Sequence, residues 1–528
     1  MSRSEPMSEP FTITTAISYP NGRPHIGHAY EAIATDAIAR FQRMMGRDVF
    51  FQTGTDEHGL KMDQAARARG LTPRALADEM AGYFKDMDDA LGISYDRFIR
   101  TSEDAHHSAS QAIWRAMEAN GDLYLGRYEG WYSVRDEAFY DEKELTEGES
   151  GEKLSPQGTP VEWTVEESWF FRLSKYQQPL LDLYERHAEF IRPDSRRNEI
   201  MRFVEGGLSD LSVSRTSFDW GVKVPGGEGH VMYVWVDALT NYLTGCGYPD
   251  DADRMARYWA EGGDIIHVIG KDIVRFHAVY WPAFLMSAKL PLPRQVFGHG
   301  FLLNRGEKMS KSVGNVADPL ELAGRFGVDQ LRYFLLAEVS FGNDGSYSAE
   351  AIVQRANSDL ANSFGNLAQR TLSFIAKNLE GQLPAGGTSA AADTDLRNLI
   401  DTAVSDYVAA MSNLAPSTAI EIWMRAVFAC NQYIDAQAPW ALRKTDPDRM
   451  VAVLATLYEA IGNLAIMISP VIPGSASALL DQMGVPQERR SYTDIGSNGW
   501  YPALVETGFI LGAPKPLFPR LESAEADA

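Results

Sequence analysis

The chain has 528 residues, too many for one hydrophobic core, and this length predicts about three or four structural units. Its 49 Lys and Arg residues are outnumbered by 71 Asp and Glu residues, and the net charge of −22 argues for solubility and against general affinity for a phosphate backbone. Two widely separated cysteines, Cys246 and Cys430, argue against a disulfide framework and fit a reducing cytoplasm, and the polar first ten residues argue against export.

The first predicted element is a strand, turn and helix over residues 11–41. Apolar residues at 11–17 predict a buried strand. The helix is expected to open at Pro24, because N–H groups in the first helical turn have no partner within the helix and proline lacks this group. His25, Gly27 and His28 then lie at a helix N-terminus, which attracts anions. Gly27 lets a flat ring or a phosphate approach the backbone, and the imidazoles add donors. Alone, this HxGH pattern also fits a helix with half-buried surface histidines.

A second strand at 48–52 is followed by Asp56, Glu57 and His58. Residues at the carboxyl ends of parallel strands face the ligand crevice, so this cluster is a candidate binding element. Asp56 could instead be a helix N-cap, and the cluster could also suggest a metal. Residues 63–118 predict helices whose apolar stripe belongs to the core.

From residue 119 to 229, short aromatic-rich segments with Gly and acidic turns predict an insertion into the sheet. The sheet is expected to resume as a strand at 231–238, and Trp235, Ala238 and Tyr242 can share one face. Another buried strand at 265–270 leads to Ile273 and His277 at its carboxyl end. An ordinary core stripe and a satisfied core histidine are the competing interpretations.

A glycine-bounded loop at 306–315 follows the strand at 296–302 and carries Lys308 and Lys311. Two ammonium groups can neutralise the charge that grows on a transferring phosphate. From residue 349 the pattern is helical with proline breaks, which predicts an all-α unit of about five helices. The apolar run at 451–473 is interpreted as a buried bundle helix because Glu459 and Asn463 interrupt it.

The HxGH motif and the lysine loop, in this order and about 280 residues apart, resemble the HIGH and KMSKS signatures of class I aminoacyl-tRNA synthetases, and other segments resemble the methionyl-tRNA synthetase family. The resemblance implies an α/β fold with a Rossmann-like parallel sheet, an inserted connective domain and a following all-α anticodon-binding bundle. The implied units are a split catalytic domain (11–118 and 230–305), the insertion (119–229), the KMSKS loop and stem-contact segment (306–355), the anticodon-binding domain (356–515) and a tail (516–528).

The resemblance also implies roles for individual residues. The catalytic residues would be His25, His28, Lys308 and Lys311. The residues that contact ATP would be His25, Gly27, His28, Gly270, Asp272, His299, Phe301, Leu302 and Lys311. The residues that contact methionine, with Asp56 on its α-ammonium group, would be Ala16, Ile17, Tyr19, Asp56, Trp235, Ala238, Tyr242, Ile273 and His277. The residues that contact the CAU anticodon would be Asn366, Arg370 and Trp440.

The activity implied by the resemblance is that of a methionine–tRNA ligase. With ATP and Mg²⁺ it would form methionyl-adenylate and pyrophosphate, then transfer methionine to the 3′ end of tRNA(Met), initiator tRNA included. The methionine carboxylate is already ionised, so activation needs alignment and charge stabilisation rather than a general base. A cytoplasmic monomer with no membrane partner is expected, because the chain ends without the appended tRNA-binding and dimerising module of longer relatives.

Many relatives carry zinc knuckles in the insertion. Here the expected ligand positions hold Ser133, Asp136, Leu154 and Gln157. This set supplies no thiolate or imidazole for a tetrahedral zinc site, so we predict that the insertion binds no zinc. We also predict no metal-ligating residues elsewhere in the chain.

Three alternatives stay open from the sequence: a class I synthetase for another amino acid, a small nucleotidyltransferase that shares HxGH, and a non-catalytic tRNA-binding paralogue. The lysine loop and the helical unit disfavour the transferase. The intact His25, His28, Lys308 and Lys311 disfavour the paralogue.

Overall fold

The computed structural model describes residues 8–133, 138–148, 151–304, 306–308, 316–496 and 499–522. Its central element is a six-stranded sheet in the order β3-β2-β1-β13-β14-β9, in which every neighbouring pair is parallel. The strands are β1 (Pro10–Thr15), β2 (Asp48–Thr55), β3 (Arg97–Arg100), β9 (Ile191–Arg192), β13 (Ile265–Gly270) and β14 (Gln295–His299). The expected Rossmann-like parallel sheet is confirmed, and its carboxyl ends meet at one edge.

Side chains alternate between the two faces of this sheet, as the two-residue period of a strand requires. Phe51 and Ile266 face a core built around α1 (Ile26–Met44) and the C-terminal helices. Phe50 and Ile265 face a second core with α4 (Asp104–Ala119) and α10 (Trp281–Ala288). Both faces are therefore covered, and the strand ends are left for a ligand. The remaining helices of this half are α2 (Leu60–Ala68), α3 (Pro73–Ala90), α7 (Val234–Leu239), α8 (Asn241–Gly245) and α9 (Ala252–Tyr258).

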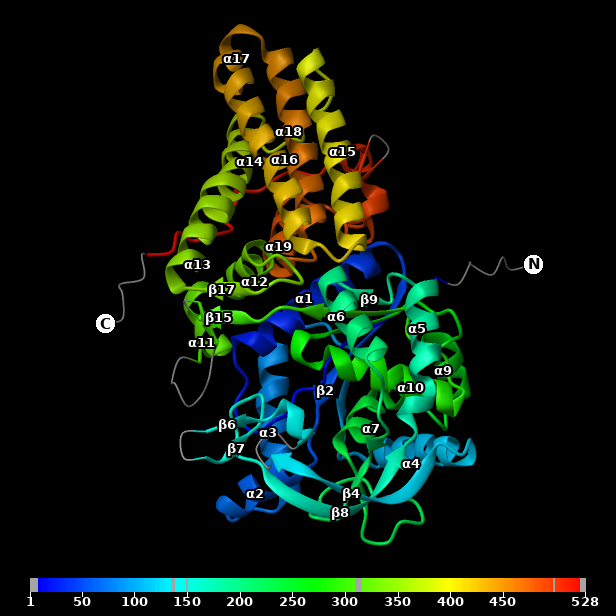
Figure 1. Ribbon diagram of the computed structural model, residues 1–528. Helices are drawn as coiled ribbons and strands as arrows, with labels where there is room; N and C mark the ends of the chain where they lie inside the picture. The colour runs from blue at the N-terminus through cyan, green and yellow to red at the C-terminus, as the bar shows by residue number, and fades with distance from the viewer. Residues whose placement is uncertain are drawn as a thin grey trace, which may run out of the picture.

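The insertion is a separate antiparallel sheet in the order β10-β8-β4-β5. Its long strands β4 (Leu123–Ser133) and β8 (Glu162–Phe171) form the ribbon at the bottom of Figure 1, away from the helical bundle. The shorter elements of the insertion are β5 (Ala138–Tyr140), β6 (Thr146–Glu147), β7 (Lys153–Leu154), α5 (Gln177–Arg186), α6 (Asp194–Glu205), β10 (Leu211–Ser212) and β11 (Ser214–Arg215), which pairs with β12 (Val231–Met232) just beyond the insertion. The two-residue strand β9 also lies within 119–229, yet it pairs with β14 and extends the parallel sheet.

The helical unit stands at the top of Figure 1. It is reached through a small sheet of β15 (Leu302–Asn304), β16 (Glu307–Lys308) and β17 (Gly345–Tyr347), with α11 (Pro319–Phe326) and α12 (Val328–Glu338). The following helices are α13 (Ala349–Arg355), the π-helical η5 (Ala356–Gly365), α14 (Asn366–Asn378), α15 (Ala391–Ser412), α16 (Pro416–Gln437), α17 (Pro439–Thr445), α18 (Pro447–Ile468), α19 (Pro473–Gln482) and α20 (Trp500–Glu506). The first three of these follow one another without a break across position 355/356, where the sequence suggested a boundary.

Helix α18 is the apolar run noted in the sequence. Among the described residues it is the one helix long and apolar enough to cross a membrane, but 89% of its apolar window is buried inside the protein. It packs against α14, α15, α16, α17 and α19, which confirms a buried bundle helix.

Two predicted local structures were wrong. The segment expected as a strand at 231–238 is a strand only at Val231–Met232, and α7 begins at Val234. A short apolar run fits either structure, and its periodicity does not distinguish them. The first helix begins at Ile26, two residues after Pro24, because His25 is its N-cap in extended conformation (φ −131°).

Candidate active site

The two histidines of the HxGH motif are tied to the first turn of their own helix. Nδ1 of His25 accepts a hydrogen bond from the Gly27 N–H (3.0 Å), and Nδ1 of His28 accepts one from the His25 N–H (3.1 Å). The Gly27 N–H is therefore used by His25. Because each Nδ1 accepts, the ring proton lies on Nε2, where it can be donated. A Cβ at position 27 would lie 2.8 Å from Cε1 of His25, so the folded-back ring requires glycine.

Glu31, one helical turn after His28, joins two strand ends and was missed by sequence reasoning. Its carboxylate accepts from the Ala16 N–H (3.0 Å) and from Nε2 of His299 (2.7 Å). Nδ1 of His299 faces the Gly300 carbonyl (2.8 Å), so both ring nitrogens face acceptors. Burial alone would lower the pKa of His299, but its hydrogen bond to Glu31 and the Glu31 charge raise it. The crevice thus holds an imidazole that favours its charged form.

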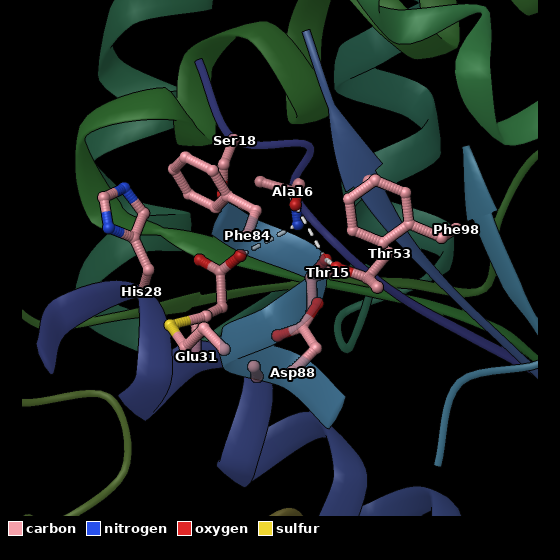
Figure 2. A pocket seen from close by; sticks show the side chains of 12 residues that line it. Thr15, Ala16, Ser18, His28, Glu31, Thr53, Phe84, Asp88 and Phe98 are labelled. Atoms are coloured by element: carbon pink, nitrogen blue, oxygen red, sulfur yellow. Dashed lines mark hydrogen bonds between the residues drawn. The ribbon is translucent and has the colours of Figure 1, made fainter. Parts of the chain in front are cut away.

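A small cavity of about 10 Å³ lies beside His28, between α1 and α3, and has room for about one water molecule (Figure 2). Thr15, Thr53, Glu31 and Asp88 line it. Burial raises the pKa of Asp88 well above its usual range. The cavity is too small for a nucleotide, so it is not itself a nucleotide site.

Several of the residues predicted to contact methionine belong to one extended apolar core. Ala16, Trp235, Tyr242 and Ile273 all pack on the same buried core. The Tyr242 hydroxyl lies 2.7 Å from Nε2 of His277, and Nδ1 of His277 lies 2.9 Å from the Ile273 carbonyl. That carbonyl can only accept, so Nδ1 carries the proton and Nε2 accepts from tyrosine. Burial lowers the pKa of His277 to about 4, so the ring is neutral.

Behind this cluster lies His267, a strand residue that the sequence analysis did not single out. It stacks on Tyr242 with ring centroids 4.0 Å apart, and Nδ1 lies 2.9 Å from the Thr14 hydroxyl. The Trp281 indole N–H donates to its Nε2 (3.3 Å). Burial lowers the pKa of His267 well below its usual value, so a second neutral ring supports the pocket wall.

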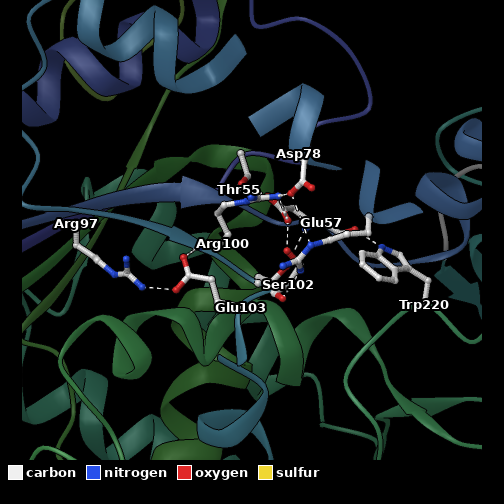
Figure 3. A network of polar contacts seen from close by, with 10 residues as sticks. Thr55, Glu57, Asp78, Arg97, Arg100, Ser102, Glu103 and Trp220 are labelled. Carbon is white, nitrogen blue, oxygen red and sulfur yellow. Dashed lines mark hydrogen bonds and ion pairs between the residues drawn. The ribbon is translucent and has the colours of Figure 1, made fainter. Parts of the chain in front are cut away.

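Asp56 lies at the end of β2, where its N–H donates to the Ser18 carbonyl (2.9 Å) and its side chain is buried. The next residue, Glu57, is fixed on every side (Figure 3). Its carboxylate receives Nε and Nη2 of Arg100 at 2.7 and 3.0 Å, and its carbonyl accepts from the Trp220 indole at 2.6 Å. Asp56 is therefore held next to a rigid ionic anchor.

The predicted ATP residues lie at the ends of β13 and β14. Gly270 and His299 are opposite each other in register. The side chain of the exposed Asp272 folds back over Gly270. A Cβ at position 270 would lie only 2.6 Å from its Oδ1. The Phe301 N–H donates to Asp344 (2.8 Å) and is thereby used within the protein, whereas the Phe301 carbonyl accepts from the Gly345 N–H (2.9 Å) through one of its two lone pairs. Lys308 lies in β16, and Lys311 lies outside the described residues.

The three predicted anticodon residues come from two helices at the far end of the bundle. Asn366 opens α14, and Arg370 follows one turn later, 5.5 Å from the ring centroid of Trp440. Trp440 lies in the first turn of α17, two residues after the left-handed Ala438 (φ 44°), and is 45% exposed. Arg370, Phe374 and Trp440 line a cavity of about 170 Å³.

The predicted zinc-free region contains a cluster of buried hydroxyl groups. Thr159 Oγ1 lies 2.6 Å from Ser133 Oγ and 2.8 Å from Ser155 Oγ. Of the other aligned positions, Leu154 has no ligand atom, Gln157 is exposed, and Asp136 lies outside the described residues. Neutral hydroxyls do not replace the thiolates and imidazoles of a structural zinc site, so the described residues do not fit the metal.

Comparison with known proteins gives one consistent result. A family model described as "tRNA synthetases class I (M)" matches residues 11–372, and one described as "Anticodon binding domain of methionyl tRNA ligase" matches residues 383–528. The chain is 58% identical to the methionine–tRNA ligase of Brucella suis over 98% of this chain and 99% of that protein. It is 56% identical to that of Mesorhizobium japonicum over 97% and 98%.

Solved structures agree with the sequence matches. The chain resembles Mycobacterium tuberculosis methionyl-tRNA synthetase in complex with methionyl-adenylate, with a TM-score of 0.92 and 52% identity over 97% of this chain and 100% of that one. Against the free-state structure of the same organism's enzyme the TM-score is 0.86, with 48% identity over 98% and 100%.

Proposed function

The chain belongs to the methionyl-tRNA synthetase family of class I, and from this premise we propose that it activates L-methionine with ATP and transfers it to tRNA(Met). The observation that carries the proposal is identity of 58% over nearly the whole of both chains, and it is supported by the position of the histidine pair after β1 and of Asp56 after β2, which are neighbouring parallel strands. Neither alternative, a synthetase for another amino acid or a non-catalytic paralogue, accounts for both the sequence identity and the positions of these residues.

The reaction has two displacement steps. An oxygen of the methionine carboxylate attacks the α-phosphorus of ATP, and the bond to pyrophosphate breaks. A terminal ribose hydroxyl of tRNA then attacks the carbonyl carbon of the adenylate, and AMP leaves. The proposed catalytic groups are the Nε2–H donors of His25 and His28 and the ammonium groups of Lys308 and Lys311, which stabilise charge at phosphorus. Mg²⁺ accompanies ATP in this proposal and adds positive charge on its phosphates.

Substrate binding is assigned to three sets of groups. Asp56 forms an ion pair with the α-ammonium group and so aligns the carboxylate. The apolar cluster around Tyr242 and His277 takes the thioether, since neutral aromatic surfaces suit a polarizable sulfur and the ring pair adds no charge. The proposed nucleotide contacts are Gly270, Asp272, His299, Phe301 and Leu302. The Phe301 N–H already donates to Asp344, so in this proposal Phe301 contacts the nucleotide through its carbonyl oxygen, which can accept a second hydrogen bond, or through its ring.

The tRNA contacts are assigned to the far end of the bundle. An exposed indole can stack on an unpaired base, and Asn366 and Arg370 can hydrogen-bond its edge. The proposal extends to initiator tRNA as a substrate, a cytoplasmic location, a monomeric state and the domain bounds given above. Sedimentation velocity tests the monomer.

Amino-acid-dependent pyrophosphate exchange tests the function. Methionine alone among the standard amino acids should support rapid exchange, and purified tRNA(Met) should become charged. Lys311→Ala should lower adenylate formation by at least about a hundredfold with methionine affinity nearly intact, because the ammonium group acts on the developing phosphate charge. A faster exchange with another amino acid would overturn the specificity, and no exchange with any would favour the non-catalytic paralogue.

A further inference from the structure

A buried carboxylate that the proposed chemistry does not use lies next to the proposed methionine site. Asp237 is 1% exposed and belongs to α7, the helix that carries Trp235 and Ala238. Its Oδ2 lies 2.7 Å from Nδ1 of His58, and its Oδ1 lies 2.8 Å from Nε2 of His106. Both histidines are buried as well, His58 in the loop after β2 and His106 in α4.

The cluster is also connected to α8 through Thr244. Nδ1 of His106 lies 3.0 Å from the Thr244 hydroxyl, and that hydroxyl donates to the Thr240 carbonyl (3.1 Å). Burial alone would raise the pKa of Asp237, but the charge and hydrogen bond of His58 and those of His106 lower it below its usual range. A buried carboxylate is expensive without such partners, so the cluster is retained only if all three side chains stay in place.

We propose that Asp237 is a positioning residue that makes the ammonium anchor and the thioether pocket one unit. Through Oδ2 and His58 it holds the loop of Asp56, two residues earlier in the chain. Through its own backbone it carries the pocket residues Trp235 and Ala238, and through Oδ1 and His106 it is fixed to α4. The inference rests on the proposed methionine-binding roles of Asp56 and of this pocket.

Glu57 provides a comparison within the same loop. Its carboxylate bonds Arg100, Thr55 and Ser102, which lie on β3, β2 and the turn after β3 (Figure 3). These partners are not part of α7. A change at Glu57 should therefore disturb the ammonium anchor alone, whereas a change at Asp237 should disturb both ends of the substrate.

Three substrates separate the two ends: L-methionine, its α-hydroxy analogue, which lacks the ammonium group, and norleucine, which replaces the sulfur with a methylene. For Asp237→Asn we expect kcat/KM for methionine to fall by about tenfold, mainly through KM, because one charged hydrogen bond is weakened. The preference for methionine over the hydroxy analogue should fall by about tenfold and that over norleucine by about threefold. Glu57→Gln should lower only the preference for methionine over the hydroxy analogue.

Controls keep the test specific. Asp393→Asn weakens a buried ion pair in the helical bundle, where Arg449 lies 2.5 Å away, and it should leave both preferences unchanged. If Asp237→Asn does not fold, the test uses His58 instead. His58→Leu removes the hydrogen bond to Asp237 and should lower both preferences, whereas His58→Asn, whose amide N–H can replace Nδ1–H, should restore them. Equal loss toward all three substrates, or a change in only one preference, would overturn the proposal. Asp56→Asn tests the proposed role of Asp56 separately. If this variant keeps the preference for methionine over the hydroxy analogue, Asp56 does not bind the ammonium group.

Discussion

A buried guanidinium links the helix of the HxGH motif to the helical bundle. Arg332 of α12 is fully buried, and its Nη2 donates to Asp36 of α1 at 2.6 Å. The same side chain donates to the Leu91 carbonyl (3.2 Å), the Pro470 carbonyl (3.1 Å) and the Val471 carbonyl (3.0 Å). The last two lie between α18 and α19. We predict that Arg332→Met weakens both the fold and the coupling between its halves.

The size of the effect follows from what each partner keeps. Asp36 still accepts from the Ser94 N–H at 2.7 Å and from Arg40 at 2.8 Å, so its charge is not left alone. Three buried carbonyls lose a donor. The free energy of unfolding should therefore fall by about 3 kcal/mol, the lower end of the range for breaking a buried pair.

The pH dependence gives a second measure. Burial would raise the pKa of Asp36, but Arg332, Arg40 and Ser94 together lower it. A carboxyl whose pKa is lowered in the folded state stabilises that state above its unfolded pKa of about 4, and loses this contribution as the pH falls through the folded value. The stability difference between the wild type and Arg332→Met should be full at pH 7 and should narrow as the pH falls below about 4.

Urea unfolding measures the stability, and pyrophosphate exchange is compared with tRNA charging. Charging should fall more than exchange, because only charging needs the bundle and the active site in register. Arg355→Met is the matched control: this arginine pairs with Glu338 and Asp359 but is 40% exposed, so its loss should cost less than about 1 kcal/mol. Equal losses of exchange and charging, or a stability change no larger than that of the control, would refute the reasoning.

Three further predictions concern separate sites. Tyr242→Phe should raise the KM for methionine by about tenfold with little change in kcat, because His277 loses a buried hydrogen-bond donor; an unchanged KM would contradict the proposed pocket. Because burial lowers the pKa of His277 to about 4, the KM of the wild type for methionine should not vary between about pH 6 and 8. Thr159→Val should destabilise the segment at 153–161 by about 1–3 kcal/mol, seen as faster amide exchange there, whereas EDTA should leave the melting temperature of the wild type unchanged. Trp440→Ala should raise the KM for tRNA by at least about tenfold and leave pyrophosphate exchange intact, and an equal loss in both assays would count against base stacking.

The parts of the candidate site that the sequence could predict are those governed by chain-local rules. Asp56, Gly270 and His299 end or follow parallel strands, and such ends must share one edge of the sheet. The capping roles of His25 and His28 were not predicted, because histidine is an uncommon N-cap and Pro24 gave a stronger start signal.

The parts that could not be predicted are contacts between side chains far apart in the chain. Glu31 and His299 are 268 positions apart, and His58 and Asp237 are 179 apart. No periodicity or motif links such pairs, since each depends on how the strands are ordered. The strand β9 was missed for a related reason: two residues, Ile191 and Arg192, carry no alternation, and their pairing with β14 depends on the neighbouring fold.

These long-range contacts share a chemical feature that bears on the mechanism. Glu31, Asp36 and Asp237 each receive hydrogen bonds from two different elements, and each joins pieces that the motifs alone do not connect. Apolar side chains of the same volume could stabilise the fold as well, but they would set no direction for the groups they contact. A reaction that needs alignment of an ionised carboxylate rather than a general base depends on direction above all. The buried carboxylates therefore fix the relative orientation of elements separated by more than half of the chain.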